Sequence, residues 1–167
     1  MGPVDIFGDG FGRVQELVGE VLDGLSTDQL SWQPAPSANP IGWLVWHLSR
    51  VQDSQISDVA GTDQVWLAGG WAQRLALAYD PAATGYGQRA EEVAAFRASA
   101  ELLAGYHQAV HQATGRFLAT VRPDDLDRVV DRRWDPPVTL GVRLVSILAD
   151  DLQHVGQAAY LKGLPGT

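Results

Sequence analysis

The sequence predicts an all-α fold, a four-helix bundle with a long crossover connection. Three observations carry this prediction. Apolar residues recur at three- and four-residue spacing in four long segments, and no stretch of comparable length alternates like a strand. The segment between the second and third helices is long and irregular. With 167 residues, 46% of them hydrophobic and 19% charged, we expect a single domain spanning residues 1–167.

The ends of the helices are indicated by their capping residues. Asn39 is a favourable N-cap, and Pro40 suits the first helical position, where its missing N–H costs nothing. Thr139 is a plausible N-cap for the last helix, and Gly163 is a natural C′ residue. The expected elements are helices over residues 4–25, 39–61, 91–121 and 139–163, a capped turn over 26–30 and an extended link over 132–137.

The crossover, residues 61–87, is the least regular part of the chain. We expect one or two short helices in it, lying over a cleft, because long connections in compact domains are commonly functional. It contains Trp66 and Trp71. These, like Trp43 and Trp46, fit either core packing or the walls of an apolar substrate cleft.

Charge and cysteine content exclude several classes of function. Acidic residues number 20 against 12 basic ones, a net charge of −8, which argues against binding to nucleic acid or to an anionic membrane. The chain has no cysteine, so any metal must be held by His, Asp or Glu, and any reacting thiol must come from outside. The first residues show no signal-peptide pattern, and we expect a cytoplasmic protein.

A metal site is predicted from helical spacing. His47 shares a stripe with Leu44 and Val51, so its side chain is expected to face inward. Asp150 and His154 lie one turn apart on the last helix, with adjacent side chains. One His from a facing helix and an Asp/His pair supply three ligands and leave a fourth position open, as in catalytic zinc sites.

The spacing alone leaves alternatives open. His47 could be a hydrogen-bonded core histidine and Asp150 a partly exposed polar residue. Asp151, three residues before His154, competes as a ligand, and Gln157 fits either a group that supports a ligand or the polar surface.

A second histidine pair has equally good spacing. His107 and His111 also lie one turn apart on the third helix. If this pair does not contribute to the metal site, we expect His107 in the bundle core and His111 in solvent.

Two segments together resemble a known family. Residues 39–48, NPIGWLVWHL, and residues 149–163, ADDLQHVGQAAYLKG, resemble the DinB-like four-helix-bundle superfamily, in particular its actinobacterial mycothiol-dependent enzyme branch. That branch includes mycothiol S-transferases and the metal-binding domain of mycothiol-dependent maleylpyruvate isomerase. The resemblance implies a divalent metal held by His47, Asp150 and His154. Three borderline ligands without a thiolate favour zinc or nickel.

The resemblance implies a metal-dependent thiol S-transferase that conjugates mycothiol to small electrophiles in detoxification, with the metal activating the thiol. A metal-dependent hydrolase and a non-catalytic metal- or ligand-binding stress protein are the alternatives. The expected partners are a small-molecule thiol and an electrophile, with no nucleic acid and no membrane, and a homodimer is left open.

Overall fold

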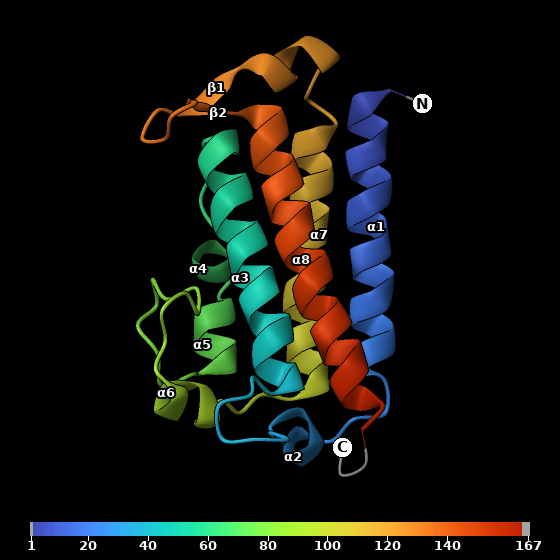
Figure 1. Cartoon of the computed structure of the whole chain (residues 1–167), viewed down its shortest axis with the longest axis vertical. Coiled ribbons are helices and arrows are strands. Elements are labelled where there is room, and N and C mark those ends of the chain that lie inside the picture. The colour runs from blue at the N-terminus through green and yellow to red at the C-terminus, as the bar shows by residue number, and fades with distance from the viewer. Residues whose placement is uncertain (1, 165–167) are drawn as a thin grey trace.

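Four long helices form the bundle that the sequence predicts (Figure 1). The computed structural model describes residues 2–164, so Met1 and residues 165–167 of the predicted domain lie outside the described part. The long helices are α1 (Pro3–Leu22), α3 (Ile41–Ala60), α7 (Ala100–Leu118) and α8 (Leu140–Lys162). Both α3 and α1 pack against α7 and α8, and α1 and α8 run antiparallel to α3 and α7. None of the helices within residues 2–164 is both long and apolar enough to cross a bilayer.

Shorter elements fill the connections. They are α2 (Thr27–Leu30), α4 (Val65–Ala68), α5 (Trp71–Leu75), α6 (Ala90–Ala94), a 3-10 helix η1 (Pro123–Asp127), and the strands β1 (Val129–Asp131) and β2 (Val138–Thr139). The crossover therefore contains two short helices, α4 and α5, as expected.

Two short strands, which the sequence did not predict, flank the extended link expected over residues 132–137. They pair antiparallel, with Val129 opposite Thr139 and Asp131 opposite Val138, and residues 132–137 connect them. Asp131 holds this connection, since its carboxylate accepts bonds from Arg133 and, on α8, from Arg143. Strands of three and two residues are too short to produce a recognisable alternation.

The second helix begins one residue later than predicted. Pro40 is its N-cap rather than its first helical residue, because Pro40 has an extended backbone with ψ of 158°. The carbonyl of Pro40 accepts the first helical bond, from the N–H of Leu44. Asn39 therefore lies outside the helix.

The third helix is not continuous as predicted over 91–121. The chain leaves α6 after Ala94, and α7 begins at Ala100 after the N-cap Ser99, whose side chain accepts a bond from the N–H of Leu102. In between, Phe96 is buried against Trp46, with ring centroids 6.0 Å apart. A large side chain docked in the core and a strong N-cap thus separate two helices.

The first and fourth helices differ from prediction only at their ends. The first spans Pro3–Leu22 and stops before Gly24, which has a φ of 75°. The last has Thr139 as its N-cap, as predicted, but Gly163 ends it in a right-handed conformation rather than a left-handed one.

The core is centred on the first half of α3, where every residue from 41 to 50 is buried. Trp46 has no exposed surface and contacts the rings of Trp66 and Tyr79 from the crossover. The crossover thus covers a side of α3 that the other long helices leave open, and it lies beside α3 in Figure 1.

A buried ion pair holds the crossover to the bundle. Asp53 on α3 accepts bonds from the backbone N–H groups of Val65 and Trp66 at 2.8 and 2.7 Å, and so caps α4. Arg50, one turn earlier, lies 3.6 Å from this carboxylate and donates to the carbonyl of Ala83. Both side chains are 1% exposed. They therefore fix both ends of the crossover, and its second end leads directly to the candidate site.

Candidate metal centre

The structure brings together the three residues that the sequence singled out. His47 on α3 and the pair Asp150 and His154 on α8 each offer one ligand atom, and these atoms lie within 4.8 Å of one another. They meet because α3 and α8 are antiparallel neighbours and each ligand lies on the face turned to the other helix. His47 is 7% exposed, whereas Asp150 and His154 keep some contact with solvent.

The imidazole of His47 is oriented by the crossover. Its Nδ1 donates to the carbonyl of Thr84 at 2.5 Å, which leaves Nε2 as the unprotonated nitrogen. Trp43, one turn earlier, stacks on the ring at 4.7 Å with an interplanar angle of 11°. Burial lowers the pKa of His47, which favours the neutral form that a metal requires.

His154 is oriented in the same way from its own helix. Its Nδ1 donates to Oε1 of Gln157 at 3.2 Å, so Gln157 is a supporting group rather than merely polar surface. Its Nε2 lies 3.5 Å from Oδ1 of Asp150, and this hydrogen bond is the main reason why the pKa of His154 is raised. A positive charge is therefore favoured beside Asp150.

These features fit a divalent cation. Oδ2 of Asp150 is buried and has no hydrogen-bond partner among the described residues. In its neutral form each imidazole carries its lone pair on Nε2, because each Nδ1 donates to an oxygen. A cation held by His154 would take the place of the proton that its Nε2 shares with Asp150. Two imidazole nitrogens and one carboxylate oxygen are the ligand set of several catalytic zinc sites, which leave one position for a substrate.

Gly85 allows the crossover to approach the site. Its φ is +96°, and a Cβ there would lie 2.5 Å from Nδ1 of His47 and 2.9 Å from the ring of Trp43. Three residues later along the loop, Gln88 accepts a bond from Nε1 of Trp43 at 2.7 Å. Sequence reasoning did not assign Thr84, Gly85 or Gln88 to the site, and the only signal was the Gly-Tyr-Gly irregularity at residues 85–87.

Asp151, the alternative ligand that the sequence offered, lies outside the site. Asp151 points into the bundle core with no exposed surface, and burial raises its pKa well above the usual range. It belongs to no group of three ligand atoms within the described residues, so it does not join this site.

His107 and His111 also stay apart from the three ligands. His107 is buried in the core, as expected, with Nδ1 3.0 Å from Oγ of Ser49. His111 is half-buried rather than solvated, and burial lowers its pKa. Neither belongs to a group of three ligand atoms in the part of the chain described.

Two hollows are relevant to ligand access. One of about 200 Å³ lies beside the site between α3 and α8, lined by Leu44, Gln157 and Tyr160 among others. A larger one of about 330 Å³ lies between α3 and α7, near Ile56 and Phe117, and none of the three ligands lines it. The smaller hollow is therefore the one that lies beside the candidate metal site.

The fold and the site together define a helical-bundle protein with a candidate three-ligand metal centre. The model of the DinB superfamily matches residues 11–158, so the chain belongs to that superfamily. A crystal structure of a conserved protein from Enterococcus faecalis is similar over 97% of this chain and 96% of that chain, with 32% identity and a TM-score of 0.90. No curated protein matches the chain.

Proposed function

We propose that this protein is a metal-dependent thiol S-transferase that joins an external thiol, mycothiol, to small electrophiles. The observation that carries the proposal is the convergence of His47, Asp150 and His154, with both imidazoles already fixed at Nδ1. The absence of cysteine from the chain supports it, because the nucleophilic sulfur then has to be a cosubstrate's.

The chain's own residues would have two roles, to bind the ion and to orient the residues that bind it. His47, Asp150 and His154 would hold one divalent ion per chain, zinc or nickel, while Thr84 and Gln157 keep the two imidazoles in the required tautomer. A bound ion would supply a lowered pKa for a thiol in the open fourth position. The hollow beside Gln157 would accept part of a reactant and hold it near that position.

The test measures loss of a model electrophile with mycothiol and metal-loaded protein. We expect acceleration that disappears after chelation and in His47→Ala, together with about one bound ion per chain by elemental analysis. A matched control is His111→Ala, which also removes a half-buried imidazole but lies outside the site. It should retain activity.

The same experiment separates the alternatives. Metal-dependent loss of an ester substrate without any thiol requirement would favour a hydrolase. Tight metal binding with no turnover of either kind would favour a non-catalytic binding protein. Protein that takes up no divalent ion at micromolar concentrations would contradict the proposal altogether.

A further inference from the structure

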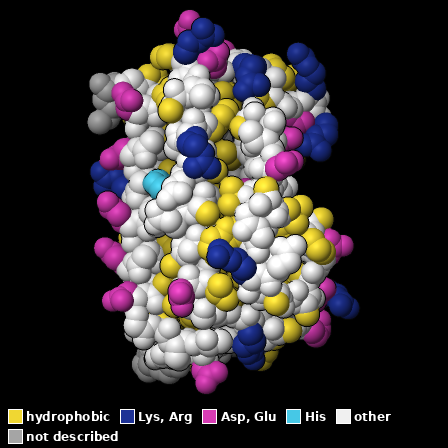
Figure 2. Space-filling model, turned by 180° about the vertical axis from the view of Figure 1, so that it is seen from behind, with side chains coloured by type: hydrophobic (Ala, Val, Ile, Leu, Met, Phe, Trp, Pro, Cys, Tyr) yellow, Lys and Arg dark blue, Asp and Glu magenta, His cyan; other side chains and the backbone are white. Residues whose placement is uncertain are grey.

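The hollow on the side of α3 that faces α7 has the features of a small-molecule pocket. Its volume is about 330 Å³, and it lies between α3, α7 and the first residues of the crossover. Pockets that bind small molecules have volumes of about 300–1,000 Å³. Figure 2 shows the molecule from behind, with α7 toward the viewer, and apolar side chains are visible there in a furrow of the upper half. We name this hollow the α3/α7 pocket.

Most of the interior of the α3/α7 pocket is apolar. Its most buried apolar residues are Ile56 and Val110, which are 4% and 1% exposed, and Phe117 forms a half-buried wall. Two charged residues of opposite sign, Asp63 and Arg116, also line the pocket, but both are exposed to solvent. A pocket of this kind binds ligands that are themselves mainly apolar.

The third charged residue of the pocket, Asp53, is buried and already fully engaged. Its carboxylate accepts bonds from the backbone N–H groups of Val65 and Trp66 and, at 2.9 Å, from the hydroxyl of Tyr106. Arg50 balances its charge at 3.6 Å. An ionic ligand would therefore lose its water and find no free counter-charge in the interior, which costs free energy. The ligand that fits this pocket is uncharged.

Ser57 offers such a ligand one polar contact. Its Oγ lies 3.4 Å from Oδ1 of Asp53 and 3.5 Å from the carbonyl oxygen of Asp63, both at the long end of the hydrogen-bond range. Because both contacts are weak, the hydroxyl can turn toward a ligand with little loss. An apolar molecule with one hydroxyl or carbonyl group matches this arrangement.

A continuous series of contacts connects the α3/α7 pocket to the metal site. Asp53 holds the beginning of the crossover through Val65, and its ion-pair partner Arg50 donates from Nε to the carbonyl of Ala83 at 3.1 Å. The next residue, Thr84, is the one whose carbonyl accepts the bond from His47. The two ends of the crossover are therefore held by one buried ion pair, with the pocket at the first end and the metal site at the second.

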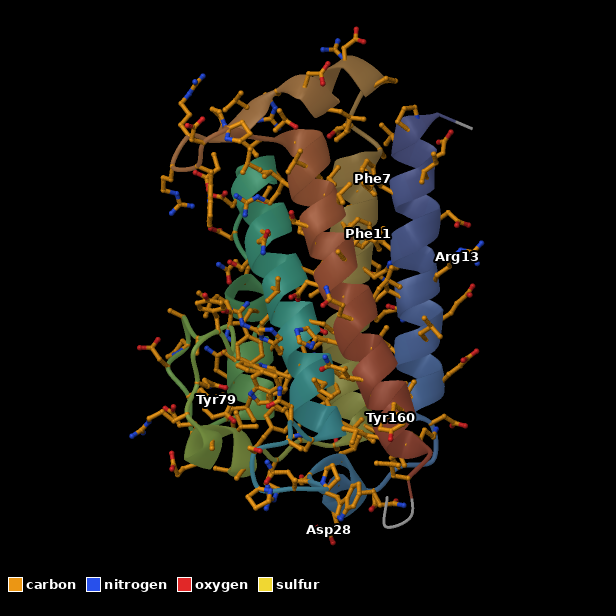
Figure 3. All side chains as sticks on the ribbon, in the orientation of Figure 1. Phe7, Phe11, Arg13, Asp28, Tyr79 and Tyr160 are labelled. Carbon is orange, nitrogen blue, oxygen red and sulfur yellow. The ribbon has the colours of Figure 1, made fainter. Side chains whose placement is uncertain are left out.

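We propose that the α3/α7 pocket binds a small, uncharged, mainly apolar molecule, and that this molecule stabilises the crossover in the position that orients His47. Val65 lines the pocket and is also bonded to Asp53, so a ligand contacts the crossover directly. Between its ends the crossover packs on α3: Figure 3 labels Tyr79, whose ring lies 5.1 Å from that of Trp46. A ligand that favours the ordered crossover then favours metal binding as well, a consequence that rests on the proposed function.

Binding of 2-naphthol, an uncharged bicyclic molecule with one hydroxyl, tests the pocket. Titration calorimetry in chelator should give a dissociation constant on the order of 100 μM. The charged analogue 2-naphthoate should bind about tenfold more weakly or worse.

Ala113→Leu fills the pocket and should weaken binding of 2-naphthol about tenfold. The matched control is Ala109→Leu, the same change at a half-buried residue of α7 that does not line the pocket, and it should leave binding unchanged. Circular dichroism checks that each variant is folded. No binding of 2-naphthol at about 1 mM, or equal weakening in the two variants, would overturn the proposal.

Amide exchange in chelator, with and without saturating 2-naphthol, tests the coupling. Exchange in residues 82–88, which do not line the pocket, should slow about fivefold. Arg50→Lys keeps a cation beside Asp53 but lacks the planar fork that contacts Asp53 and Ala83 at once. It should bind 2-naphthol and lose the slowing at 82–88, whereas the control Arg143→Lys should behave as the wild type.

An effect at residues 82–88 that is missing in the wild type, or that persists in Arg50→Lys, would contradict the coupling. Every one of these measurements uses metal-free protein. A failure of the chain to bind metal would therefore contradict the proposed function and leave the results on the α3/α7 pocket valid.

Discussion

His107 is the residue whose ionisation should be most visible in the stability of the protein. Its ring is buried, and Nδ1 donates to Oγ of Ser49, because that hydroxyl already donates to the carbonyl of Val45. Nε2 has no partner among the described residues. Burial lowers the pKa of His107 to about 3, so the folded protein keeps this ring neutral.

The pH dependence follows from the difference between the two states. In the unfolded chain His107 titrates near pH ~6.5, so below that pH the unfolded state binds a proton that the folded state does not. Its contribution to stability is therefore complete above that pH and is lost progressively as the pH falls toward 3. Between pH 7.5 and 5.5 this one group should lower the free energy of unfolding by about 1.4 kcal/mol.

His107→Asn isolates the effect, since its amide can still donate to Ser49 but does not titrate. Urea unfolding of both proteins in chelator at the two pH values gives the comparison. The variant should lose about 1.4 kcal/mol less than the wild type over this interval. Identical losses in the two proteins would show that His107 is not buried as a neutral ring.

The three candidate ligands illustrate what local sequence can predict. His47, Asp150 and His154 were identified because helical spacing determines which side chains share a face. The support of His47 by Thr84 could not be found in this way. The contact depends on where the crossover returns to α3, 37 residues after His47. The acceptor is a backbone carbonyl, which every residue has, so the identity of the residue does not indicate it.

At the scale of elements, the buried pair Arg50 and Asp53 should control the crossover. Replacing Arg50 by Met removes the donor to Ala83 and leaves the carboxylate of Asp53 buried without its cation. Breaking one partner of such a pair typically costs about 3–5 kcal/mol. We expect a loss of this size in urea unfolding, together with faster amide exchange across residues 61–88.

Arg143→Met is the matched control for this change. Arg143 on α8 is also paired, with Asp131, but its side chain is 18% exposed and its hydrogen bonds go to Gln55 and Asp131 rather than to the crossover. The control should cost less and should not change exchange in residues 61–88. Faster exchange there in both variants would mean that Arg50 has no specific role in holding the segment.

The break between α6 and α7 shows why some elements were predicted wrongly. Apolar residues keep helical spacing through Val93, Phe96, Ala100 and Leu103, so the pattern alone gives one helix over 91–121. The break arises because Phe96 docks against Trp46 from another helix, which is a tertiary contact. Long helices with repeated patterns were therefore predicted well, and junctions determined by packing were not.

At the scale of the whole molecule, metal binding should stabilise the fold. The three candidate ligands come from α3 and α8, which residues 61–139 separate along the chain, and His47 is also bonded to the crossover. An ion that binds only this folded arrangement stabilises it by about 2.7 kcal/mol at a free concentration 100 times its dissociation constant. For a chain of this size the melting temperature should rise by roughly 5–10 °C.

The dependence of this rise on individual histidines tests the location of the site. His154→Ala should abolish it, because two ligands remain and Asp150 loses its neighbour. In His111→Ala the rise should persist, since that imidazole lies on α7 outside the ligand group. Differential scanning calorimetry with added zinc, and again with chelator, measures each case. A rise lost in His111→Ala and kept in His154→Ala would place the metal on α7, and would transfer the candidate chemistry to the other histidine pair.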